Sequence, residues 1–292
     1  MKGVDCDKVS AEGQAVGDVP AAVPSPPRPD DDGGGGLPSL GVSTTVDRAR
    51  YRTLLGIVDD DARELGVPPR TVRRFLVLPW VGAALVATTA AYRPVFRFLT
   101  KEDRILEWVQ VALLLAAVVA AIGVARRLRS AGQHRTALLW ALFALGCFVI
   151  AGEEVAWGQR IFGLETPEAL DEVNHQGQIT VHNIRKVQDG VNLVFIAAGI
   201  YGCVSSVLVR GRRRPGERGP LELLTPPLFL SSLFLIVVGY KSLRLLFLHE
   251  ARFIVVKYGE YVEACLAAAF LAFAWYTLRL LDRRAEEPAV PD

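Results

Sequence analysis

The chain has 292 residues, of which 51% are hydrophobic and 22% are charged, and its formal net charge at pH 7 is +2. A charge so close to zero excludes a general attraction to nucleic acid. The apolar residues form long uninterrupted runs with arginines between them, a pattern that excludes an ordinary soluble domain and indicates a membrane protein.

Residues 1–46 are rich in Pro, Gly, Asp and Ala and contain no long apolar run. This composition cannot bury enough apolar surface to offset the conformational entropy of the chain. We therefore expect a disordered cytoplasmic tail without a secretory signal peptide.

Residues 47–73 carry apolar side chains at helical spacing with charges on the other face, namely Tyr51, Leu54, Leu55 and Val58. The pattern predicts a short amphipathic helix on the cytoplasmic membrane surface that ends near Gly66. The alternative is a solvated helix with no particular packing partner.

Residues 74–284 contain six apolar runs long enough to cross a bilayer as helices. The shortest has 18 residues, which is about 27 Å of helix and close to the thickness of the hydrocarbon core. A lone strand would leave its backbone groups unpaired in lipid, so the sequence predicts an all-α polytopic transmembrane bundle. The predicted spans are 75–92, 105–124, 136–157, 191–209, 226–247 and 258–281, followed by a cytoplasmic tail over 285–292.

The arginines between the spans predict the orientation of the bundle. Arg126, Arg127, Arg129 and Arg135 follow the second span, and a further basic run, 210–218, follows the fourth. Basic connections stay in the cytoplasm, so we expect both termini inside and a multi-pass protein of the bacterial plasma membrane. The first connection is also basic, and it is placed outside only because the other connections require it.

Glutamates gather at the predicted outer ends of three spans, at positions 107, 153, 154, 260 and 263. A charged side chain within a transmembrane helix costs roughly 2.5 to 3.5 kcal/mol at mid-membrane, so such residues are functional candidates. The long outer connection adds His182 and Asn183. The predicted catalytic residues are Glu107, Glu153, Glu154, His182 and Glu263.

Two kinds of chemistry suit these residues. Carboxylates and imidazole are suitable ligands for a divalent metal ion, and Glu154, His182 and Glu263 are the predicted ligands. A glutamate could instead act as general acid or base without a metal. No HExxH pattern is present to decide between the two.

The substrate that we expect is a membrane lipid or a lipid-linked molecule. Its predicted binding residues are Trp157, Gln159, Arg160, Asn183, Lys241 and Arg244. Three alternatives stay open: the basic residues could simply pair with the glutamates and lock the bundle, the protein could be a transporter, or it could be a scaffold without catalysis.

One segment resembles a known family. The run Glu153-Glu154-Val155-Ala156-Trp157-Gly158-Gln159-Arg160, with Phe162-Gly163, Thr166-Pro167 and later His182-Asn183, is similar to an uncharacterised group of bacterial multi-pass membrane proteins with the pattern EExxWGQRxFG and then HN. The resemblance covers about Lys101 to Asn183. It implies a membrane protein and supplies no activity.

Overall fold

The computed structural model describes residues 53–101, 104–163, 165–166, 179–180, 185–212, 219–247 and 253–286. Over these ranges the chain forms helices and no strand. Six of the helical segments are long and apolar enough to cross a membrane, which confirms the predicted all-α polytopic bundle. The tail 1–46 and the segment 287–292 lie outside the described residues.

Three short turns interrupt the sequence of α-helices, where η1 and η3 are 3₁₀ turns and η2 is a π turn. The order along the chain is α1 (Leu54–Leu65), α2 (Pro69–Thr89), α3 (Arg93–Thr100), α4 (Ile105–Ser130), α5 (His134–Glu154), η1 (Ala156–Gly158), α6 (Gln159–Phe162), α8 (Arg185–Ser205), η2 (Ser206–Arg210), α9 (Pro220–Leu224), η3 (Leu228–Leu230), α10 (Ser231–Phe247) and α11 (Phe253–Glu286).

Local sequence signals set where these helices begin and end. Thr53 caps α1 by accepting a hydrogen bond from the backbone N–H of Gly56, and Gly66 ends α1 in the left-handed conformation that glycine adopts without strain. Proline occupies the first turn of α2, α3 and α9, where its missing N–H leaves no hydrogen bond unmade.

Helices α3 and α4 differ from the sequence-based expectation. The basic connection after the first span contains α3, and α4 continues to Ser130 rather than stopping at position 124. Arg126, Arg127 and Arg129 are therefore helical residues. Hydropathy locates the apolar part of a helix, and the backbone continues as a helix beyond it because arginine is itself a good helix former.

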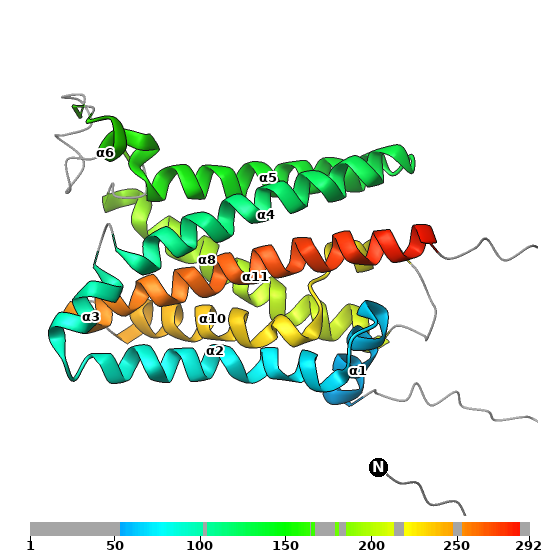
Figure 1. The fold of residues 1–292 in the computed structure, drawn as a ribbon, viewed down its shortest axis with the longest axis horizontal. Coiled ribbons are helices and arrows are strands. Elements are labelled where there is room, and N and C mark those ends of the chain that lie inside the picture. The colour runs from blue at the N-terminus through cyan, green and yellow to red at the C-terminus, as the bar shows by residue number, and fades with distance from the viewer. Residues whose placement is uncertain are drawn as a thin grey trace, which may run out of the picture. The chain divides into compact units, whose positions relative to one another are not determined.

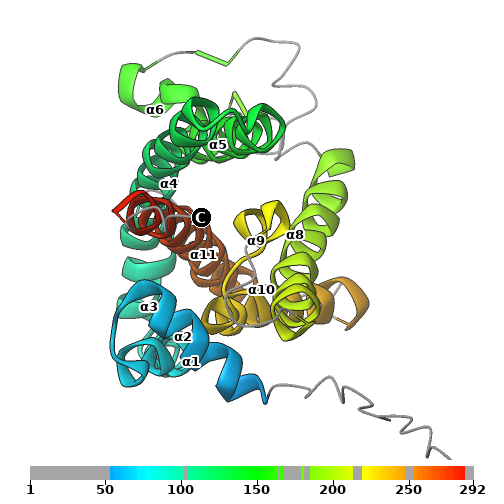
Figure 2. The same ribbon diagram turned by 90° about the vertical axis from the view of Figure 1, so that its right-hand side faces the viewer.

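Helix α11 lies at the centre of the packing. It contacts α4, α10 and α2, while α5 pairs with α4 and α8 pairs with α10. Figure 2 shows these helices end on, with α4 and α5 on one side of α11 and α10 with α8 on another. At Gly202 of α8 an added Cβ would fall on the ring of Phe234 in α10, so the close approach of these two helices requires glycine there.

The bundle has two ends, which we call the α1 end and the α6 end. The α1 end contains α1, the turn between α4 and α5, and the end of α11 (Figure 1). The α6 end contains α3, α6 and the start of α11 (Figure 1).

Candidate functional site

Glutamates from three spans meet at the α6 end. The carboxylate of Glu154, the last residue of α5, interacts electrostatically with Glu263, Glu260 and Glu107, and it hydrogen-bonds with Gln110. Glu107 is buried, and Glu154 and Glu263 are half-buried. The structure therefore brings together the three spans that the sequence analysis singled out. We call Glu107, Glu154, Glu260 and Glu263 the carboxylate cluster.

Gln110 adds an unmet hydrogen-bonding group to the cluster. Its side chain is 1% exposed, and its amide oxygen has no hydrogen-bond partner within the described residues. A buried polar atom without a partner is unfavourable, so this oxygen is available to a group that donates a hydrogen bond.

Lys241 is the buried cation beside the cluster. Its Nζ lies 2.7 Å from Glu263 Oε1 and 3.3 Å from Asn192 Oδ1, and it stands 4.7 Å from the ring centroid of Phe195. This is the kind of ion pair that the bundle-locking alternative requires. Lys241 also supplies a positive charge close to where an anionic group could bind.

The backbone after α5 makes an unusual turn. Ala156, Trp157 and Gly158 have positive φ angles of 47°, 54° and 82° in succession. Positive φ is uncommon for residues other than glycine, and such strain gathers at functional sites. The predicted span continues to position 157, but α5 ends at Glu154.

This turn places the ring of Trp157 across the end of α5. The indole N–H donates to Glu153 Oε1 at 2.7 Å, and a Cβ at Gly152 would lie 2.8 Å from the ring. Glu153, predicted to be catalytic, therefore holds Trp157, and Glu154 is the one that joins the carboxylate cluster.

Gln159 organises the segment that follows the turn. Its Nε2 donates to Thr166 Oγ1 at 2.7 Å, and its Oε1 accepts from the backbone N–H of Ile179 at 2.6 Å. Its amide thus has two partners within the chain, and its contact with substrate stays a prediction. The predicted site residues His182 and Asn183 and the side chain of Arg160 lie outside the described residues.

The structure tests the metal and substrate predictions only in part. Arg244 is half-buried and hydrogen-bonds with the hydroxyl of Tyr240. Within the described ranges, no three His, Cys, Asp or Glu side chains are grouped so that they could hold one metal ion. The described carboxylates therefore do not form a metal centre by themselves.

A second polar cluster, which the sequence analysis did not predict, lies at the α1 end. Arg210 Nη1 lies 2.5 Å from Asp61 Oδ1 and 3.1 Å from the hydroxyl of Tyr276, and Arg210 Nη2 donates to the carbonyl of Thr225 at 3.3 Å. Tyr276 in turn donates to Glu64 Oε2 at 2.6 Å. We call Asp61, Glu64, Arg210 and Tyr276 the arginine cluster.

Helix α1 is inserted against the bundle by this cluster. Its buried residues are Ile57, Val58, Asp61 and Ala62, whereas Leu54 and Leu55 are exposed. The amphipathic pattern had predicted that Leu54 and Leu55 share the apolar face. The buried face of α1 instead carries Asp61. Its carboxylate pairs with Arg210 and accepts a hydrogen bond from the backbone N–H of Leu228 at 2.8 Å.

Burial gives Asp61 an unusual acidity. Desolvation raises the pKa of Asp61 to about 6, against the opposing attraction of the Arg210 guanidinium. Asp61 therefore takes up a proton close to neutral pH. Arg210 is the last residue of the π turn η2.

No family model matches the chain, and neither a curated protein nor a solved structure matches it. Its function is therefore inferred from the geometry of the clusters.

Proposed function

We propose that this multi-pass membrane protein is an enzyme that acts on a lipid or lipid-linked substrate at the carboxylate cluster. Glu154 exchanges the proton in the reaction, and Lys241 holds an anionic group of the substrate. The observation that carries the proposal is the meeting of Glu154 with Glu107, Glu260 and Glu263 from three different spans.

Acid–base chemistry follows from the mutual repulsion of these carboxylates. Like charges held close together disfavour full ionisation, so such a group retains a proton or attracts a cation. A glutamate that can hold and release a proton is suited to general acid–base catalysis, which contributes typically 10² to 10⁴-fold to a rate.

The position of the cluster along the helices supports a lipid substrate. Glu107 lies in the first turn of α4, Glu154 ends α5, and Glu263 lies ten residues, or about 15 Å, after the start of α11. With 34 residues, α11 is about 51 Å long and exceeds the hydrocarbon core of about 30 Å. Glu263 thus falls near the level of lipid headgroups.

A transporter needs a polar path through the bundle. Between Glu263 and Tyr276 on α11, the buried side chains are Ala264, Cys265, Leu266, Ala267, Ala269, Phe273 and Ala274. This stretch of about 20 Å is apolar and gives no polar route between the two clusters along this helix. The described residues therefore favour an enzyme over a transporter.

Metal-assisted catalysis depends on residues beyond the described ones. His182 is the histidine that the sequence predicts as a metal ligand. Metal analysis of the purified wild type, Glu154→Gln and His182→Ala proteins tests whether a metal ion takes part in catalysis. A stoichiometric divalent ion that both variants lose would support it, and an unmetallated active wild type would exclude it.

The lipid composition of cells tests the enzyme itself. Wild type and Glu154→Gln proteins are expressed at equal levels in a strain that lacks the chain, and the membrane lipids are compared by mass spectrometry. We expect the wild type to change the amount of a lipid or lipid-linked species. The variant, whose reaction rate should be about 10² to 10⁴-fold lower, should lose most of that change.

Asp282→Asn is the matched control, because Asp282 pairs with Arg127 at the α1 end. It removes one carboxylate from the same protein without touching the cluster. Equal lipid changes in the wild type and Glu154→Gln strains would rule out the proposed role of Glu154.

A further inference from the structure

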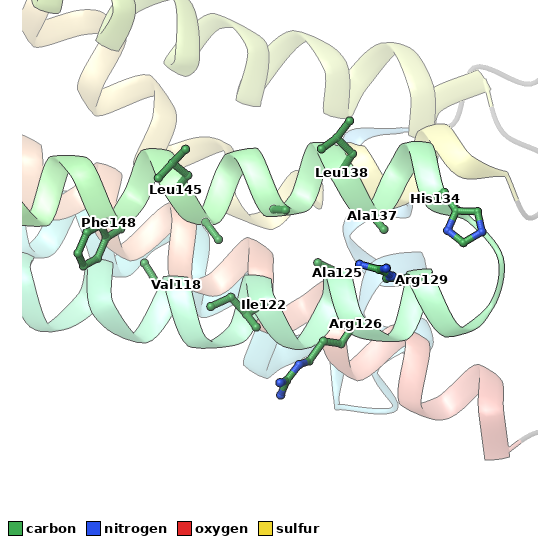
Figure 3. Close-up of a pocket in the computed structure, with 12 residues that line it drawn as sticks. Val118, Ile122, Ala125, Arg126, Arg129, His134, Ala137, Leu138, Leu145 and Phe148 are labelled. Atoms are coloured by element: carbon green, nitrogen blue, oxygen red, sulfur yellow. The ribbon is translucent and has the colours of Figure 1, made fainter.

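A groove runs along the outside of the α4–α5 pair, and its basic end lies at the α4–α5 turn, at the opposite end of the bundle from the carboxylate cluster (Figure 1). Its volume is about 670 Å³, and it reaches from Phe148 to His134 on α5, or about 21 Å of helix. Figure 3 shows Phe148 near one end of the groove and His134 at the other. The groove therefore extends over about two thirds of a bilayer core of about 30 Å.

Most of the groove wall is aliphatic. Val118 and Ile122 on α4 and Leu138 and Leu145 on α5 line the groove (Figure 3). Small residues between them, such as Ala141, keep the groove open. A wall of this kind suits a hydrocarbon chain.

The end of the groove at the α4–α5 turn is basic. Arg126, Arg129 and His134 line it, and within the described ranges the structure gives none of their side chains an ion pair. Arg127, which lies between the two arginines in sequence, instead pairs with Asp282 of α11. The arginines on the groove side thus keep their charges available.

We propose that this groove binds an anionic phospholipid, with one acyl chain between α4 and α5 and the phosphate at Arg126, Arg129 and His134. The lipid matches the groove in two ways: the apolar wall suits the acyl chain, and the basic end suits the anionic headgroup. Basic pockets between transmembrane helices bind anionic headgroups in this way. The site is separate from the proposed enzymatic site and does not depend on it.

Native mass spectrometry of the full chain in detergent tests the proposal. Phosphatidylglycerol and phosphatidylcholine with identical acyl chains are titrated separately. The wild type should bind one phosphatidylglycerol about tenfold or more tightly than phosphatidylcholine. Arg126→Gln/Arg129→Gln should abolish this preference.

Two variants test the apolar wall and the specificity of the charges. Ala141→Trp fills the groove and should lower the binding of both lipids, whereas Ala116→Trp, on an exposed part of α4 outside the groove, should not. Arg70→Gln/Arg74→Gln removes the same charge from exposed positions of α2 and should keep the preference.

Several outcomes would overturn the proposal. These are equal binding of the two lipids by the wild type, or a loss of preference in the Arg70→Gln/Arg74→Gln control as large as that in the groove variant. A dimer that Ala141→Trp dissociates without changing lipid binding would show that a second copy of the chain covers the groove. The charge variant and the filling variant alter different parts of the groove, so either one tests the site if the other does not fold.

Discussion

The two polar clusters at opposite ends of the bundle differ in how their charges are matched. In the arginine cluster, Arg210 contacts Asp61, Tyr276 and the carbonyl of Thr225, and the second carboxylate oxygen of Asp61 accepts from a backbone N–H. In the carboxylate cluster, Glu154 has three other glutamates around it, of which Glu263 pairs with Lys241 and Glu260 pairs with Lys257.

The difference separates a structural cluster from a chemical one. The buried charges of the arginine cluster pair with one another and hold α1 against the bundle, although Arg210 Nε has no hydrogen-bond partner within the described residues. A group of acids in which Gln110 keeps an unpartnered oxygen is improved by a proton, a cation or a substrate. We therefore expect substitutions at the α1 end to act on stability and those at the α6 end to act on function.

The largest expected effect comes from Arg210→Met. This change leaves the carboxylates of Asp61 and Glu64 beside an apolar side chain, and removing one partner of a buried ion pair costs about 3 to 5 kcal/mol. Chemical denaturation in detergent at pH 7.5 should show this loss in the free energy of unfolding. The double variant Asp61→Asn/Arg210→Met should recover more than half of it, and no recovery would contradict the pairing.

The pH dependence of stability isolates Asp61. A pKa raised to about 6 from 3.8 means that the folded protein binds this proton more tightly than the unfolded chain does. The contribution of Asp61 to stability is thus complete below pH 3.8 and is lost as the pH rises through 6, a change of about 3 kcal/mol.

Unfolding measured between about pH 4 and pH 7.5 for the wild type and Asp61→Asn tests this sign. The stability of the wild type relative to the variant should fall as the pH rises across this window. A difference that does not vary with pH would mean that Asp61 titrates at its ordinary value.

Glu154→Gln should have a smaller and opposite effect on stability. Neutralising one carboxylate relieves the repulsion in the cluster, so we expect a gain of about 0.5 to 2 kcal/mol, the size of a typical stabilising substitution. Denaturation at pH 7.5 should show a gain, while the lipid change expected of the wild type is lost. Destabilisation as large as that of Arg210→Met would instead assign the cluster a structural role.

The smallest effect is expected for Arg63→Met. Arg63 pairs with Asp60 on the exposed face of α1, and its side chain is 74% exposed. Exposed pairs of this kind contribute about 0 to 1 kcal/mol, so unfolding should hardly change. Arg63 and Arg210 both pair with an acid of α1. A similar loss of unfolding free energy in Arg63→Met and Arg210→Met would show that burial does not decide how much each pair contributes to stability.

The sequence predicted the spans well and the helix limits less well. Hydropathy detects an apolar run whatever it packs against, and all six spans were found in this way. Helix α3 was missed because Arg93 and Arg97 made its segment resemble a connection. The end of α4 was placed too early for the same reason.

The two clusters were predictable to different degrees. Acids at the ends of spans stand out because the membrane penalises them, so Glu107, Glu154 and Glu263 were found from sequence. Asp61 was not, because a charged residue on an amphipathic helix is ordinarily solvated, and its partner Arg210 lies 149 residues away. A contact at that separation is decided by tertiary packing.

Helix α11 carries a member of each cluster, since Glu263 pairs with Lys241 and Tyr276 contacts Arg210 and Glu64. Glu263 and Tyr276 are about 20 Å apart along α11 and, at about 3.6 residues per turn, point in nearly opposite directions. Sliding or rotating α11 would thus break contacts on two sides at once. We expect α11 to stay fixed while any opening of the protein moves the other spans around it.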